Sequence, residues 1–235
     1  MAIVLREDKG AALTHAEHDT NFSELDKLPN GKTFPKEAPI GIKLDIDNPD
    51  FGWQDIEGYL LNYPDSPAPA SANLYRGGIR SLQFGEGDEA FVNFHMPHDY
   101  AVGTPIYIHI HWSHNSSIVT GGSCTWAFEL MYAKGYDQDA FKAPVTIAIV
   151  QDASIVPYQH MIAETIASDN GGSAVTIDTN LLEVDGIFNC RLYLDSNDIT
   201  TSNASTVEPF AHFVDIHYQS NALPTIGRNF PFYGE

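Results

Sequence analysis

The stretch Pro105-Ile106-Tyr107-Ile108-His109-Ile110-His111-Trp112 decides the fold. Nearly every residue in it is β-branched or aromatic, and such residues favour a pleated, half-buried strand. Successive side chains of a strand point to opposite faces, so His109 and His111 share one face. The stretch therefore predicts a β-strand that presents two histidines side by side.

Seven further segments of this kind surround it, separated by turn-forming residues such as Asp169-Asn170-Gly171-Gly172. Eight antiparallel strands with loops of this length favour a jelly-roll-like β-sandwich over residues 73–235, and an immunoglobulin-like sandwich is the nearest alternative. Helices long enough for βαβ crossovers are not expected between the strands, which argues against a parallel sheet. The predicted strands cover 90–95, 105–112, 124–132, 145–150, 158–167, 174–182, 187–194 and 210–218.

Residues 1–72 have a different composition, because prolines interrupt them throughout. Proline lacks a backbone donor and restricts the residue before it, so long regular elements are not expected here. We interpret this zone as an N-terminal arm, with the Pro/Ala/Ser-rich segment 64–72 as a linker to the sandwich.

One short helix is expected within the arm, over about residues 15–27. Thr14 and Glu17 form a capping box, in which each side chain accepts from the other residue's backbone N–H. Phe22 and Leu25 then follow with helical spacing and form a narrow apolar stripe. So short a helix is marginal alone and needs a surface to pack on.

The charge balance restricts the partners of the chain. It has 31 acidic against 12 basic residues, a formal net charge of −19. Phosphate binding requires clustered Lys and Arg, so neither nucleic acid nor an anionic membrane surface is an expected partner. The charge is interpreted as a solubilising surface.

The remaining global features indicate a chain made and folded in the cytosol. The two cysteines, Cys124 and Cys190, lack metal-binding or redox spacing and are expected to be buried free thiols. No apolar run is long enough to span a membrane, and no apolar signal-peptide region follows the first residues.

The histidine pair is the sharpest candidate for chemistry. His-x-His on a strand is how cupin-type jelly rolls begin a metal site, and His114, His212 and His217 are further candidate ligands. The glutamate that cupins supply shortly after the pair is missing, since the next glutamate is Glu129. We therefore expect the histidines to be satisfied by hydrogen bonds, and we predict no metal and no cofactor, with His109, His111 and His217 as the weak candidates.

No catalytic arrangement stands out elsewhere. His98-Asp99 could orient a base, but no nucleophile motif accompanies it. Trp112 and Trp126 are expected in the core. The chain is predicted not to be an enzyme.

One segment carries a family resemblance. Residues Gly10 to Leu25 resemble the G-x-x-L-T-x-x-E-x-D-x-N-F-x-x-L opening found near the N-termini of many phage tail-fibre and other virion appendage proteins. The resemblance implies a segment at the virion-proximal end, oligomeric assembly as a trimer or higher, contacts with other virion proteins and no catalysis. The assembly residues that it implies are Leu13, Thr14, Glu17, Asp19, Asn21, Phe22 and Leu25.

A second resemblance extends this expectation to the body of the chain. Segments 98–112 and 215–220 are similar to uncharacterised β-rich phage proteins. The sequence is thus expected to be a structural protein located in the virion, of tail-fibre, appendage or adaptor type. Alternatives are a head-decorating capsid protein, a module that binds host-surface carbohydrate, and a cupin-like metalloenzyme.

Overall fold

The computed structural model describes residues 51–169, 176–221, 225 and 227–232. The expected helix over 15–27 and its assembly residues lie outside these ranges. Within them, no helix is long and apolar enough to cross a membrane. The described elements are β1 (Gly52–Gly58), β2 (Ser71–Arg76), β3 (Ile79–Gln83), β4 (Glu89–His95), β5 (Tyr107–Ser113), β6 (Val119–Gly121), β7 (Ser123–Ala133), β8 (Val145–Asp152), β9 (Met161–Ile166), β10 (Ser168–Asp169), β11 (Ile177–Asp178), the 3₁₀-helix η2 (Thr179–Leu181), β12 (Ile187–Asn197), β13 (Thr200–Thr201) and β14 (Phe210–Ser220).

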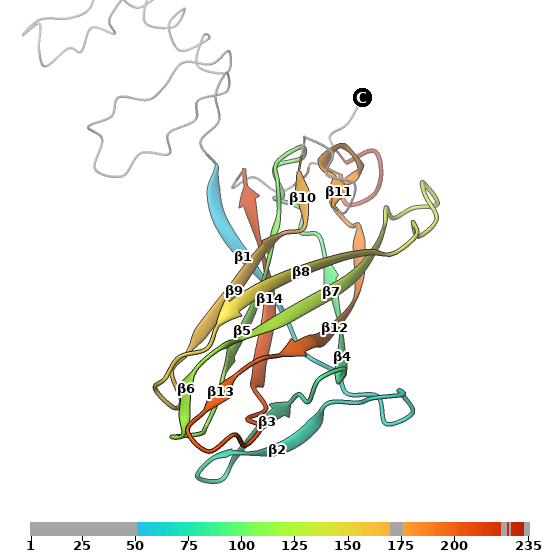
Figure 1. Cartoon of the computed structure of the whole chain (residues 1–235). Coiled ribbons are helices and arrows are strands. Elements are labelled where there is room, and N and C mark those ends of the chain that lie inside the picture. Colours follow the sequence, from blue (N-terminus) through green and yellow to red (C-terminus); the bar gives the residue numbers. More distant parts are fainter. Residues whose placement is uncertain (1–50, 170–175, 222–224, 226, 233–235) are drawn as a thin grey trace, which may run out of the picture. The chain divides into compact units, whose positions relative to one another are not determined.

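The main strands form two facing sheets (Figure 1), and β10-β11 and β6-β13 form two small additional ones. The larger sheet, called sheet A here, has the order β2-β3-β14-β5-β9, and β1 pairs with β14 beside it. The smaller sheet, sheet B, has the order β4-β12-β7-β8. All pairings within sheets A and B are antiparallel, and the described ranges hold two short parallel pairings, the one between β10 and β11 and a single bridge between Pro69 and Glu89.

The connectivity is that of a jelly roll. Strand β3 pairs with β14, β4 with β12, β5 with β9, and β7 with β8, so the first half of the chain pairs with the second in reverse order. Two of these pairs, β3-β14 and β5-β9, lie in sheet A, and the other two, β4-β12 and β7-β8, lie in sheet B. This is the arrangement of a long hairpin that is rolled up on itself. The prediction of an antiparallel jelly-roll sandwich is confirmed.

The core lies between the sheets because the strands alternate in character. On β5, Ile108, Ile110 and Trp112 are fully buried and face sheet B, where Trp126 of β7 meets Trp112 edge to face at 6.0 Å. Burying large apolar side chains is the main source of stability for such a fold. The expected core positions of both tryptophans are confirmed, and both cysteines are buried free thiols.

The expected boundary at residue 73 is wrong, because strands of the sandwich start earlier. Strand β1 pairs with β14 along its whole length, from Gly52 opposite Ser220 to Gly58 opposite Val214. The segment 64–72 is not a free linker either: Ala70 is fully buried, and the backbone on both sides of Pro69 hydrogen-bonds to Glu89. The compact unit runs from Gly52 onward.

The strand expected over 174–182 is also wrong. Only Ile177–Asp178 form a strand among its described residues, and η2 follows directly. The Asp178 carboxylate accepts from the backbone N–H of Asn180 at 2.9 Å and caps this turn. Such local side-chain bonding competes with strand pairing. Seven of the eight expected strands are present with shifted ends, and β1, β2, β3, β6, β10 and β13 are additional.

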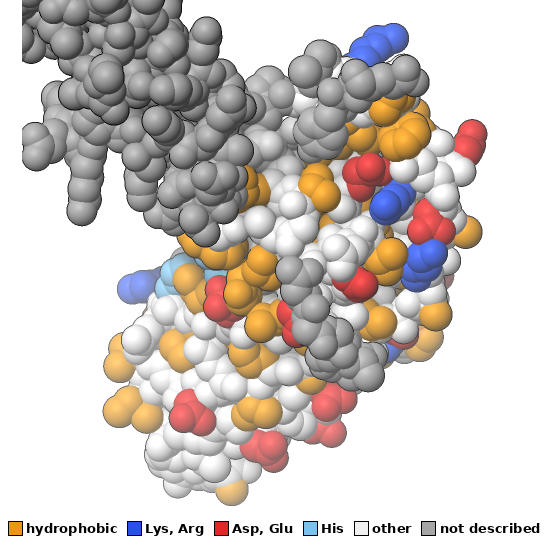
Figure 2. Space-filling view, turned by 90° about the horizontal axis from the view of Figure 1, so that it is seen from above, with side chains coloured by type: hydrophobic (Ala, Val, Ile, Leu, Met, Phe, Trp, Pro, Cys, Tyr) orange, Lys and Arg blue, Asp and Glu red, His pale blue; other side chains and the backbone are white. Residues whose placement is uncertain are grey.

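The surface matches the acidic composition. On the face shown in Figure 2, acidic side chains are spread between neutral and hydrophobic ones, and basic side chains are few. Charges distributed in this way keep a protein soluble.

Candidate functional site

The outer face of sheet A, which points away from the core, carries a cluster of ionisable side chains. The pairing register of the strands brings this cluster together. Asp215 of β14 lies opposite His109 of β5, and His109 lies opposite Glu164 of β9. Residues in direct register have Cβ atoms about 4.5–5.5 Å apart, so their side chains meet. On the next row, Asp55 of β1 lies opposite His217 of β14.

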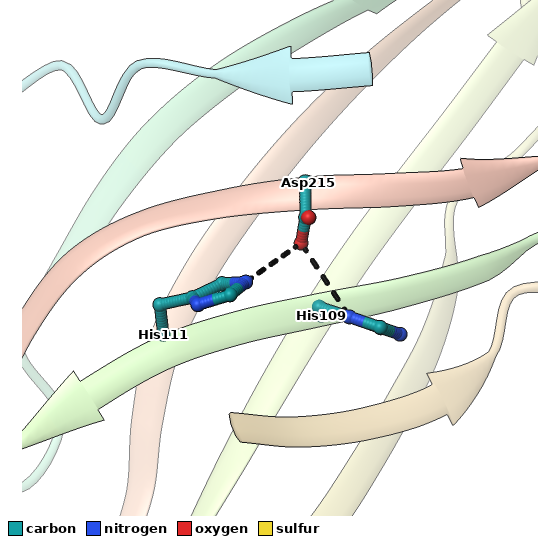
Figure 3. Close-up of side chains that lie close together, drawn as sticks. All are labelled: His109, His111 and Asp215. Atoms are coloured by element: carbon teal, nitrogen blue, oxygen red, sulfur yellow. Dashed lines mark ion pairs between the residues drawn. The ribbon is translucent and has the colours of Figure 1, made fainter. Parts of the chain in front are cut away.

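Three members of the cluster converge on one point (Figure 3). The Asp215 side chain points between the two histidines of β5, with its Oδ1 atom 3.7 Å from His109 Nδ1 and 3.3 Å from His111 Nε2. The three atoms lie within 4.8 Å of one another. We call His109, His111 and Asp215 the buried triad, since each residue is at most 8% exposed.

The three converging atoms of the buried triad have no hydrogen-bond partner. Buried polar atoms are nearly always hydrogen-bonded, and exceptions require an explanation. Among the described residues, the only other buried side-chain atom of this kind is Trp126 Nε1. Three of the four such atoms are thus gathered at one place.

The opposite nitrogen of each triad histidine does have a partner. His109 Nε2 donates to the Glu164 carboxylate, which fixes the imidazole tautomer with its proton on Nε2. His111 Nδ1 is hydrogen-bonded to His160 Nε2 at 2.8 Å. Each ring is therefore held in orientation by a second residue, with its unpartnered nitrogen directed at Asp215.

Burial opposes charge on the triad. Burial raises the pKa of Asp215, and the nearby histidines His111, His109 and His217 only partly offset this. Burial likewise lowers the pKa of His111, against the opposing attraction of Asp215. The Asp215 carboxylate and the protonated His111 ring are thus poorly solvated in the buried triad.

Aromatic and polar side chains cover the triad. Phe213 stacks on His111 with ring centroids 4.0 Å apart, and the His217 ring lies 3.7 Å from that of His109. His217 Nε2 bonds to Asp55 at 2.6 Å. Beside this cover is an open pocket of about 480 Å³, lined by Trp53, Tyr107, Glu164 and His217.

The structure separates the histidines that the sequence singled out. His109 and His111 belong to the triad, whereas His217 lies in the layer over it, 3.9 Å from both Asp215 and Glu164. His114 and His212 have other partners: the carbonyl of Ser154 for the former, the hydroxyls of Ser81 and Ser113 for the latter. The third converging residue, Asp215, was missed. The alternation of Phe213, Asp215 and His217 places Asp215 on the outer face of the last strand, but it does not show that this strand lies beside His109.

The His98-Asp99 pair is not a catalytic dyad. His98 Nε2 pairs with Asp185 at 2.9 Å, while Asp99 accepts from the hydroxyls of Tyr218 and Ser220. Both residues therefore connect the turn after β4 to other segments, His98 to the turn before β12 and Asp99 to the end of β14.

A second hollow lies on the outer face of sheet B, with a volume of about 280 Å³. Its lining combines aromatic, amide and charged side chains. Arg191 donates to Glu89 at 2.7 Å and to Glu129 at 2.9 Å, so the charges are fixed in place. Tyr63, 46% exposed, lies against Phe91 at its edge. Asn93 and Asn189 add amide groups.

Comparison with known proteins gives no family. The chain matches no family model and no curated protein. Among solved structures, it is similar to the CBM22-1–GH10 modules of Clostridium thermocellum xylanase 10B complexed with xylohexaose, at 15% identity and a TM-score of 0.32, over 70% of this chain and 26% of that one. It is also similar to tripeptidyl peptidase 2, at 6% identity and a TM-score of 0.35, over 67% of this chain and 10% of that one. The chain spans a small part of the length of both proteins.

Proposed function

We propose that the protein is a structural component of a bacteriophage particle, of tail-fibre, appendage or adaptor type, attached through its N-terminal segment. The observation that carries this proposal is the segment Gly10–Leu25, which meets every position of the appendage-type opening. The predicted capped helix presents Phe22 and Leu25 on one stripe, and such a stripe gains stability only when another surface covers it.

The jelly-roll body is compatible with this role. It is a β-sandwich with large apolar side chains exposed on sheet A, among them Trp53, Ile162 and Ile166. Exposed apolar side chains that lie close together commonly mark contact surfaces. In the proposed particle the body assembles with other copies, as a trimer, and the N-terminal segment contacts another virion protein.

The experiment is an incorporation test in phage particles. Antibody labelling and mass spectrometry of purified virions should find the chain in the particle. A double Phe22→Asp, Leu25→Asp variant should be lost from particles, because both charges fall on the apolar stripe. Ser23→Asp, which lies off the stripe, is the matched control and should be incorporated normally. Particles that lack the wild-type chain would refute the proposal.

A second function, binding of host-surface carbohydrate, is favoured by the hollow on sheet B. Carbohydrate sites combine an exposed aromatic ring with amide and charged groups that bond hydroxyls, as Tyr63, Asn93 and Arg191 could do here. Host-glycan arrays probed with the wild-type protein and with Tyr63→Ala test it. Binding that Tyr63→Ala abolishes and Tyr59→Ala retains would support a glycan site, since Tyr59 is 76% exposed and is not part of that lining.

A further inference from the structure

We infer that the buried triad of His109, His111 and Asp215 is a binding site for one divalent transition-metal ion, with Zn²⁺ as the best fit. The inference goes beyond the proposed function and does not depend on it.

The first argument is the set of unpartnered atoms. His109 Nδ1, His111 Nε2 and Asp215 Oδ1 are buried, face one another and make no hydrogen bond. The Glu164 carboxylate holds the proton of His109 on Nε2, so Nδ1 presents a lone pair toward Asp215. When His111 donates from Nδ1 to His160, its Nε2 also presents a lone pair. Three lone pairs that face each other repel, and a cation between them turns the repulsion into three bonds.

The second argument is distance. Ligand atoms around a tetrahedral zinc, with bonds of about 2.0–2.2 Å, lie roughly 3.3–3.6 Å apart. The Asp215 oxygen lies 3.3 Å from His111 Nε2 and 3.7 Å from His109 Nδ1. The two histidine nitrogens lie within 4.8 Å of each other, and side-chain rotations that bring them closer would complete the geometry.

The third argument is the surrounding layer. A metal-bound histidine usually donates its other N–H to a carboxylate or another acceptor, which fixes its tautomer and raises its basicity. Glu164 accepts in this way from His109, and His160 is placed to do so for His111. Two imidazoles and one carboxylate suit zinc or iron(II), and they leave a coordination position for water.

The other ionisable residues nearby do not form the site. Asp55 and Glu164 are 55% and 51% exposed at the side chain, and each already pairs with a histidine. The buried triad is the group whose atoms lack partners. An ion there would join β5 to β14, two strands distant in sequence, and so reinforce the centre of sheet A.

The test uses the full-length protein after chelator treatment, titrated with Zn²⁺ in a calorimeter. The wild-type chain should bind one Zn²⁺. Asp215→Asn should weaken binding by at least about 100-fold, and Glu164→Gln by about 10- to 100-fold, the range typical of residues that support a ligand. His95→Gln is the control, because it removes an exposed histidine that pairs with Asp185 elsewhere in the fold.

Two readouts separate the possible results. X-ray absorption at the zinc edge of the wild-type protein should show nitrogen and oxygen ligands with two imidazoles, and it needs no variant to fold. Circular dichroism checks each variant, and His111→Gln replaces Asp215→Asn if the latter does not fold. The inference fails if the folded wild-type chain binds no Zn²⁺. It also fails if binding persists undiminished in folded Asp215→Asn, since exposed carboxylates would then hold the ion.

Discussion

His111 Nε2 and Asp215 Oδ1 lie 3.3 Å apart on neighbouring strands, and neither atom has a hydrogen-bond partner. A buried polar group left unpaired costs roughly 1–3 kcal/mol. The jelly roll thus leaves polar atoms without hydrogen bonds at the centre of its larger sheet, although they lie within ion-pair distance of one another. In a fold whose other buried polar groups are mostly hydrogen-bonded, unpaired buried atoms tend to mark functional sites.

Removing the negative charge should therefore stabilise the protein when metal is absent. In Asp215→Asn the amide N–H can donate to His111 Nε2, and one new buried hydrogen bond contributes about 0.5–1.5 kcal/mol. We expect urea unfolding in the presence of chelator to show a gain of this size. With Zn²⁺ at about 100 times its dissociation constant, the wild-type protein should gain about 2.7 kcal/mol and the variant almost none. A variant that is less stable in chelator would show that the Asp215 carboxylate already has a favourable partner.

The jelly roll was predictable because its main strands have strong local signals. Strands β5, β7 and β14 are rich in β-branched or aromatic residues, and this local signal does not depend on distant parts of the chain. The shared face of His109 and His111 follows from the same alternation.

The third residue of the triad could not be found in this way. Asp215 meets His109 only through the register between β5 and β14, and that register depends on how the whole chain is rolled up. Strand β1 was missed for a related reason. Its sequence is mostly polar and exposed, and it is a strand because β14 offers it a partner.

Gly58 allows β1 to approach sheet B. A Cβ atom at this position would overlap the side chains of Phe94 and Val92, both of which are buried. Overpacking a filled core costs about 1–3 kcal/mol. We expect Gly58→Ala to lower the free energy of unfolding by this amount in urea denaturation. Gly52→Ala, on the same strand with open space around it, should have little effect. Equal effects of the two substitutions would mean that glycine is not required for the close approach.

The two thiols should be inert in the folded protein. Burial raises the pKa of Cys124 to about 12, and burial also raises the pKa of Cys190. The thiolate is the reactive form, so neither group should react at neutral pH. An aromatic disulfide reagent should modify no thiol in native protein and both thiols after denaturation. Rapid labelling of one thiol in the native state would show that its side chain becomes exposed.

Acid should weaken the anchor between the segment before β2 and sheet B. Glu89 is buried, which by itself raises its pKa, but the hydrogen bond from Ser66 and the Arg191 guanidinium together hold the pKa below the ordinary value of 4.5. The unfolded chain therefore binds this proton at a higher pH than the folded protein does. The stabilising contribution of Glu89 is complete above pH 4.5 and is lost as the pH falls through its folded pKa.

This prediction is checked by urea unfolding across the acid range. The wild-type protein should lose stability more steeply below pH 4.5 than Glu89→Gln, which lacks the titrating group. Glu89→Gln should also be less stable than wild type at neutral pH, because Arg191 loses a charged partner that lies 2.7 Å away. Glu208→Gln removes an exposed carboxylate and controls for the loss of one surface charge. If Glu89→Gln and the wild type lose stability in parallel, Glu89 does not anchor the segment through its charge, and the backbone bonds on either side of Pro69 are sufficient.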